Sequence, residues 1–78
     1  MDWREHIHSD PAILGGKPVV RGSRISVELI LEYLSDGAGV DTILEAYPHI
    51  TQMDVRAAIA FAHDMIADER ALAQSRAA

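Results

Sequence analysis

Residues 13–27 limit the possible folds of this chain more than any other stretch, because glycine and proline interrupt them repeatedly. Gly15-Gly16 and Gly22-Ser23 are turn signals on either side of Pro18-Val19-Val20, an apolar run that favours extended backbone. An amphipathic segment follows directly. We therefore expect residues 1–25 to form an N-terminal segment with a short β-hairpin, and the rest of the chain to be helical.

The expected hairpin pairs Ile13-Leu14 with Val19-Val20. Pro18 lacks a backbone N–H, so its strand lies at an edge or begins there. Two short strands alone are marginal in water, and this hairpin is expected to pack on the helices or to pair with a second copy of itself. Residues 1–12 are expected to form a turn or a short helix, with Trp3 and Ile7 on one face of a single helical turn.

Three helices are expected after the hairpin, each with its own start and stop signals. Ser26 is a suitable N-cap for a helix from Val27 to about Asp36, which Gly37 ends. Its core-facing stripe consists of Val27, Ile30, Leu31 and Leu34.

A shorter helix is expected from Val40 to about Tyr47, with Gly39 as its N-cap and Pro48 as its stop. Thr51 and Asp54 have the spacing of a capping box, which predicts a long helix from Gln52 to about Leu72. The apolar stripe expected on this last helix consists of Val55, Ala58, Ile59, Phe61, Ala62, Met65 and Ile66.

This order predicts a mainly α fold, in which a short N-terminal β-hairpin precedes a three-helix helix-turn-helix bundle. In such a bundle the last helix would lie in a DNA major groove. The 78 residues fit a single domain, divided into the N-terminal segment and hairpin of residues 1–25, the helical body of residues 26–72 and a frayed tail of residues 73–78.

Composition favours a soluble, cytoplasmic protein. The chain has no cysteine, which agrees with a reducing compartment. It has no apolar run near the roughly 20 residues that span a bilayer, and its start does not resemble a signal sequence.

The net charge of −5 is unevenly distributed. Residues 1–27 carry four bases and three acids, whereas residues 28–78 carry three bases and nine acids. DNA binding would therefore depend on basic residues grouped by folding or doubled by dimerisation.

Six residues are candidates for contacts with DNA. The basic side chains of residues 13–27 suit phosphate oxygens, although Arg21 and Arg24 have the alternative of pairing with the acids of the first helix, Glu28 and Glu32. At the start of the last helix Gln52 suits adenine and Arg56 suits guanine, although Thr51 has the alternative of being only a cap and Arg56 that of being only a surface residue. The six candidates are Lys17, Arg21, Arg24, Thr51, Gln52 and Arg56.

No pattern in the sequence predicts an enzyme, a cofactor or a metal site. His6, His8, His49 and His63 do not have the spacing of paired ligands on one helix face. Gly15-Gly16-Lys17 lacks the spacing and the strand–loop–helix context of a phosphate-binding loop. We therefore expect a binding protein without a catalytic residue.

Two separated signatures resemble one specific family. The first is Asp10-Pro11-x-Ile13-Leu14-Gly15-Gly16-Lys17-Pro18-Val19-Val20-Arg21-Gly22-Ser23-Arg24-Ile25-Ser26-Val27. The second is Ile43-Leu44-Glu45-x-Tyr47-Pro48-His49-Ile50-Thr51, followed by Asp54-Val55-Arg56-Ala57-Ala58. Over roughly residues 8–66 the chain resembles the small prokaryotic family catalogued as domain of unknown function 433. The family usually has Ser-Pro-Glu-Glu where this chain has Gly39-Val40-Asp41-Thr42, so the second helix here has a weaker cap.

The resemblance implies an antitoxin of a type II toxin–antitoxin pair, with a homeodomain-like helix-turn-helix. Such a protein neutralises a toxin similar to PIN-domain ribonucleases and, as a homodimer, binds its own operator DNA. PIN-type active sites are acidic and bind Mg²⁺, so an inserted arginine would compete with the metal. Arg70 and Arg76 are the candidates for this contact, and a solvated helix end is their alternative. The alternative for the whole protein is an interaction adaptor that does not bind DNA.

Overall fold

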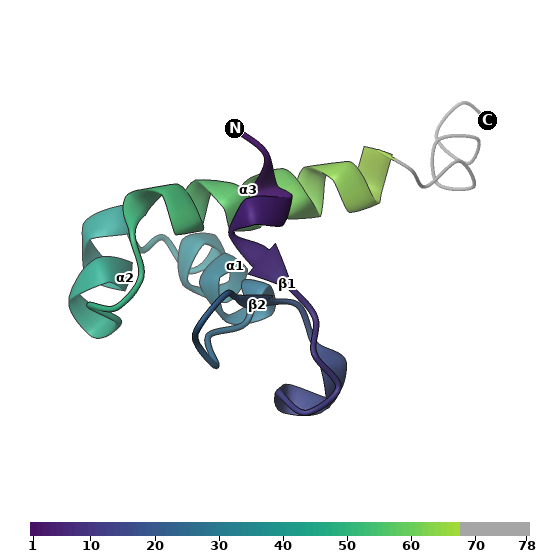
Figure 1. The fold of residues 1–78 in the computed structure, drawn as a ribbon. Helices are drawn as coiled ribbons and strands as arrows, with labels where there is room; N and C mark the ends of the chain where they lie inside the picture. Colours follow the sequence, from purple (N-terminus) through teal and green to yellow (C-terminus); the bar gives the residue numbers. More distant parts are fainter. Residues whose placement is uncertain (68–78) are drawn as a thin grey trace.

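The computed structural model describes residues 1–67, and its main body consists of three helices preceded by a small two-stranded sheet (Figure 1). A 3₁₀ turn, Trp3–Glu5, leads into strand β1, Ile7–His8. A second 3₁₀ turn, Leu14–Gly16, precedes strand β2, Val19–Val20. The helices are α1, Val27–Ser35; α2, Val40–Ala46; and α3, Gln52–Ala67. The predicted mainly α fold with a short N-terminal hairpin is confirmed.

The helix boundaries follow from local chemistry, as predicted. The hydroxyl of Ser26 accepts a hydrogen bond from the backbone N–H of Leu29 and so caps α1. Gly37, with φ of 93°, ends this helix in the left-handed conformation that glycine adopts without strain. Gly39 precedes α2 without a side-chain cap, as expected from its missing side chain. The predicted end of α3, near Leu72, lies outside the described residues.

The predicted partner of Val19-Val20 is wrong. The strand that pairs with β2 is β1, antiparallel, with Ile7 opposite Val20 and His8 opposite Val19. The backbone at Leu14, Gly15 and Gly16 has φ values of 49°, 65° and 92°, so the chain turns there and cannot form the expected strand at residues 13–14. Ile7 is buried in this sheet, and the expectation of a helical face shared by Trp3 and Ile7 is also wrong.

The core lies where the sheet, α1 and α3 meet, and its largest fully buried side chains include Ile7, Ile30, Ile43 and Val55. On α3 the predicted stripe is only partly correct. Val55 and Ala58 are buried, as expected, but Ile59, Met65 and Ile66 are exposed. Ala57 is buried in their place, because the side of α3 that carries the small alanines faces the core.

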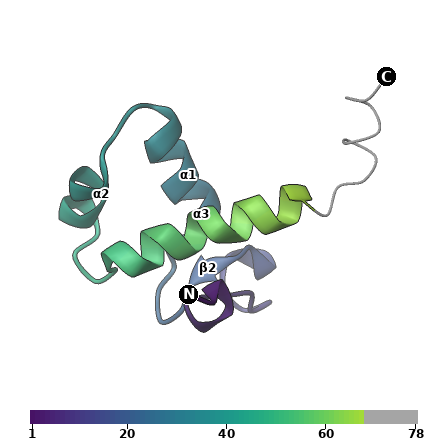
Figure 2. The same ribbon diagram turned by 90° about the horizontal axis from the view of Figure 1, so that it is seen from above.

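The N-terminal segment lies against α3, as Figures 1 and 2 both show. The indole N–H of Trp3 donates to the carboxylate of Asp64 at 2.7 Å, and the Trp3 ring meets that of Phe61 edge-on, with centroids 4.9 Å apart. This hydrogen bond holds the pKa of Asp64 below its usual range, with a further hydrogen bond from His63. The first described residues are thus fixed to the last helix.

Candidate nucleic-acid interface

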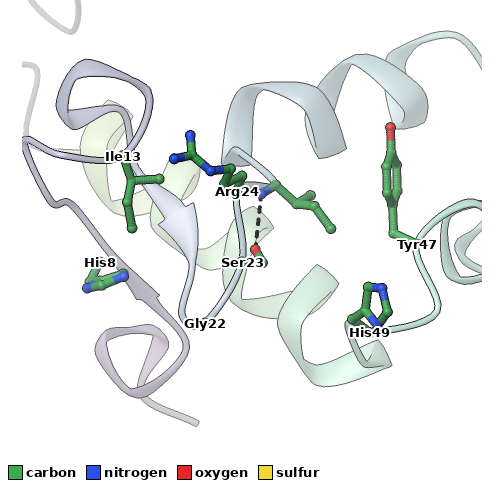
Figure 3. A pocket seen from close by; sticks show the side chains of 8 residues that line it. His8, Ile13, Gly22, Ser23, Arg24, Tyr47 and His49 are labelled. Atoms are coloured by element: carbon green, nitrogen blue, oxygen red, sulfur yellow. Dashed lines mark hydrogen bonds between the residues drawn. The ribbon is translucent and has the colours of Figure 1, made fainter.

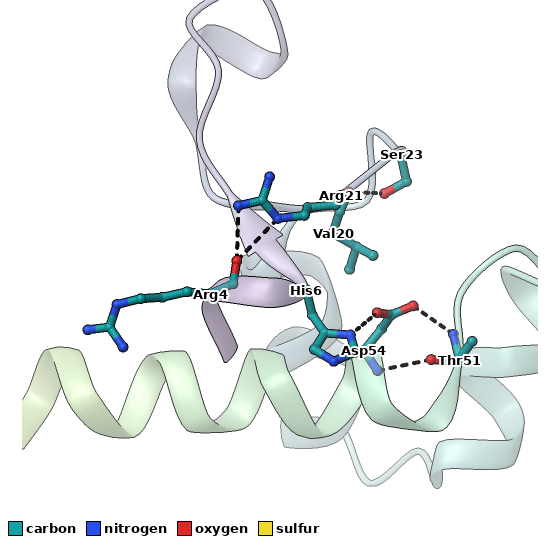
Figure 4. Close-up of polar contacts among 7 residues, drawn as sticks. All are labelled: Arg4, His6, Val20, Arg21, Ser23, Thr51 and Asp54. Carbon is teal, nitrogen blue, oxygen red and sulfur yellow. Dashed lines mark hydrogen bonds and ion pairs between the residues drawn. The ribbon is translucent and has the colours of Figure 1, made fainter. Parts of the chain in front are cut away.

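The first turn of α3 is held by a reciprocal pair of hydrogen bonds (Figure 4). The backbone N–H of Thr51 donates to Oδ2 of Asp54 at 2.9 Å, and the N–H of Asp54 donates to the hydroxyl of Thr51 at 3.2 Å. This is the predicted capping box, in which aspartate replaces the usual glutamate or glutamine. It fixes the direction in which the first side chains of α3 leave the helix.

His6 adds a second constraint on the same turn. Its Nδ1 lies 2.9 Å from Oδ1 of Asp54, so both oxygens of this carboxylate are engaged (Figure 4). The side chains of His6 and Asp54 are only 26% and 14% exposed. The sequence carried no local signal for this contact, because the two residues are separated by 48 positions.

Thr51, Gln52 and Arg56 are exposed at the start of α3, on the side of the helix away from the core. Gln52 and Arg56 are one helical turn apart and therefore neighbours on the helix surface. Ile59 and His63 continue this exposed face toward the end of the helix. The three residues predicted from the start of α3 are thus brought together on one surface.

Two of the basic residues predicted to contact phosphates are engaged within the chain. The ammonium of Lys17 donates to Glu28 at 2.7 Å, and this hydrogen bond raises the pKa of Lys17 and lowers that of Glu28. The guanidinium of Arg21 donates twice to the backbone oxygen of Arg4, at 2.9 and 3.1 Å (Figure 4). The alternative in which Arg21 pairs with Glu28 or Glu32 of the first helix is not what the structure shows.

Arg24 has a different environment, beside the connector between α2 and α3. It lines a cleft together with Tyr47 and His49 of that connector (Figure 3). Within residues 1–67, Arg24 and Arg56 are the arginines whose guanidinium groups have no hydrogen bond or ion pair. Arg70 and Arg76, the residues predicted to contact a toxin, lie outside the described residues.

Comparisons with known proteins agree with the resemblance of the two signatures. The model of a family described as "Protein of unknown function (DUF433)" matches residues 7–62. The chain belongs to this family. Its relatives include an uncharacterized protein, y4eO, of Sinorhizobium fredii, which is 41% identical over 59 residues. That alignment covers 76% of the chain and 27% of y4eO, so the chain spans about a quarter of its relative's length.

A solved structure supports the same assignment. The crystal structure of a DUF433 member protein from Anabaena variabilis has a TM-score of 0.71 to this chain at 31% identity. The similarity covers 74% of this chain and 57% of the other. Within residues 1–67 of this DUF433 domain, no group of three potential metal ligands comes together, and no described helix has the length and apolarity needed to span a bilayer.

Proposed function

We propose that this DUF433 domain is the antitoxin of a type II toxin–antitoxin pair and that it binds its operator DNA as a dimer. The observation that carries the DNA part is the exposed pair of Gln52 and Arg56 on the first turns of a rigidly capped α3. In helix-turn-helix proteins the first residues of the last helix contact base edges. A glutamine and an arginine there suit adenine and guanine.

The charge of the domain limits how it would bind. The chain has a net charge of −5, and α2 carries the exposed acids Asp41 and Glu45. The overall field therefore opposes binding to DNA, and affinity must come from a few direct contacts. Two copies on a symmetric operator would double these contacts, which is why the proposal includes a homodimer.

Toxin binding is assigned to the end of α3 and to the chain that follows it. An arginine inserted into an acidic, Mg²⁺-binding nuclease site would compete with the metal, and Arg70 and Arg76 are the residues proposed for this role. Exposed apolar side chains in the last described turns of α3 add contact area for the toxin. They include Met65 and Ile66.

Binding to the DNA upstream of the chain's own gene, measured by fluorescence anisotropy across a salt series, tests the DNA part. Replacing Arg56 with alanine is expected to weaken binding by about tenfold or more, because a lost arginine–guanine contact costs about 1–3 kcal/mol. Arg4→Gln is the matched control, since it removes one positive charge from an exposed side chain at the N-terminal turn. Equal affinities for the two variants would refute the assignment of α3.

One observation favours a second function, an interaction adaptor without DNA binding. Ile59, 46% exposed, lies on the same face of α3 as Gln52 and Arg56. A large apolar side chain on this face suits a protein partner better than a phosphate backbone. An adaptor would give no gel shift with upstream DNA at low salt but would still co-purify with the product of the neighbouring gene.

A further inference from the structure

A cleft lies where β1, the turn between β2 and α1, and the connector between α2 and α3 meet (Figure 3). Its volume is about 760 Å³, within the range of roughly 300–1,000 Å³ that is usual for small-ligand sites. Residues from three separate parts of the chain line it: His8, Ile13, Gly22, Ser23, Arg24, Ile25, Tyr47 and His49.

The polar groups of this cleft are suited to an anion. Arg24 contributes a guanidinium that has no partner within residues 1–67, and none of the lining residues is acidic. Nε2 of His8 is buried, with less than 1 Å² exposed, and has no hydrogen-bond partner within residues 1–67. An unpaired buried nitrogen is unfavourable, so a turn of the imidazole toward the cleft that lets a ligand accept its hydrogen bond removes a penalty already present.

The two sides of the cleft carry different side chains. In Figure 3 the guanidinium of Arg24 extends toward Ile13, and His8 lies on that side of the cleft. Tyr47 and His49 of the connector lie on the opposite side (Figure 3). The cleft therefore has Arg24 and His8 on one side and the aromatic rings of Tyr47 and His49 on the other.

We propose that this cleft binds a nucleoside phosphate. Arg24 and the imidazole of His8, in its Nε2–H tautomer, hold the phosphate, because a guanidinium fork and a neutral N–H donor both match its oxygens. The base lies against Tyr47, since every base has a flat face that packs on aromatic rings. A lone inorganic phosphate would leave the Tyr47 side of the cleft empty.

The phosphate has two sources, a free mononucleotide or one nucleotide of a single strand. The inference does not depend on duplex binding by α3, because Arg24 and His8 lie outside that helix. Duplex binding is tested by Arg56→Ala, whereas the cleft is tested by Arg24→Gln. The failure of one proposal therefore leaves the other open to its own test.

The experiment is an NMR titration of the ¹⁵N-labelled chain with thymidine monophosphate, with a short oligothymidylate and with inorganic phosphate. Saturable shifts are expected at His8, Ser23 and His49 with at least one thymidylate ligand. Arg24 is exposed, so Arg24→Gln should not disturb the fold. The substitution is expected to weaken that binding about tenfold, because it removes one charge-assisted hydrogen bond to the phosphate. The matched control Arg4→Gln removes the same charge and is expected to leave binding unchanged.

The ligand series identifies the source and provides the refutation. Binding of the monophosphate and the oligomer with similar affinity supports a free nucleotide, whereas binding of the oligomer alone supports a strand. The proposal is overturned if neither ligand gives saturable shifts at about 10 mM, where even a millimolar site would fill. It is equally overturned if inorganic phosphate binds as tightly as the thymidylate ligand that binds best, or if the two variants weaken binding equally.

Discussion

Replacing Asp54 with alanine is expected to destabilise the domain by about 2 kcal/mol. The carboxylate of Asp54 has two distinct partners, the backbone N–H of Thr51 and the ring of His6. Loss of a helix cap costs about 1 kcal/mol, and loss of a mostly buried hydrogen bond costs about as much again. Asp41→Ala is the matched control, because Asp41 is also an acid in the first turn of a helix but is exposed and its side chain has no hydrogen bond within residues 1–67. Its removal is expected to cost only a few tenths of a kcal/mol.

Urea unfolding followed by circular dichroism measures both variants. For a domain of this size, with a slope of about 1 kcal/mol per molar urea, Asp54→Ala should lower the midpoint by about 2 M. A double-mutant cycle with His6→Ala isolates the contact across the chain and should give a coupling energy of about 1 kcal/mol. Additive effects of the two substitutions, or equal costs for Asp54→Ala and Asp41→Ala, would refute the double role of this carboxylate.

Three further predictions concern the buried core, the turn at Leu14 and the contact between Asp64 and Trp3 at low pH. Ile30→Ala, at a side chain with no exposed surface, should cost about 3 kcal/mol in urea unfolding, whereas Glu32→Ala on the exposed face of α1 should cost little. Leu14→Gly should raise the thermal midpoint, because a left-handed leucine is strained by about 1 kcal/mol; a lowered midpoint would disprove that strain. The lowered pKa of Asp64 means that its contact with Trp3 is complete above about pH 4, the ordinary aspartate pKa, and is lost as pH falls further. The fluorescence of Trp3, the one tryptophan of the chain, should shift to longer wavelength over that acid range, and Asp64→Asn should remove this pH dependence.

The helices could be predicted from the sequence because their signals are local. Each signal acts within a few residues. Ser26 caps the start of α1, Gly37 ends that helix, and the capping box of Thr51 and Asp54 starts α3, as these residue types favour. The strand partner of Val19-Val20 could not be predicted in this way. A strand of only two residues has too little pattern to be recognised, and the left-handed turn at Leu14 removes the apolar pair that looked suitable.

The candidate site was predictable only where it lies on α3. The spacing of Gln52 and Arg56 along a helix determines that they share a face. The partners of Lys17, Arg21 and Arg24 were not predictable, because charge alone does not identify which oxygen a side chain reaches after folding. Lys17 finds Glu28, Arg21 finds a backbone carbonyl, and Arg24 is left beside the connector.

The attachment of Trp3 and His6 to α3 has a consequence for synthesis of the chain. Trp3 and His6 leave the ribosome well before Asp54, Phe61 and Asp64, the residues that they contact. The segment that carries Trp3 therefore has no docking surface until α3 has emerged, and the domain closes only after α3 has been made. A nascent chain stalled before that point would leave Trp3 exposed to proteases.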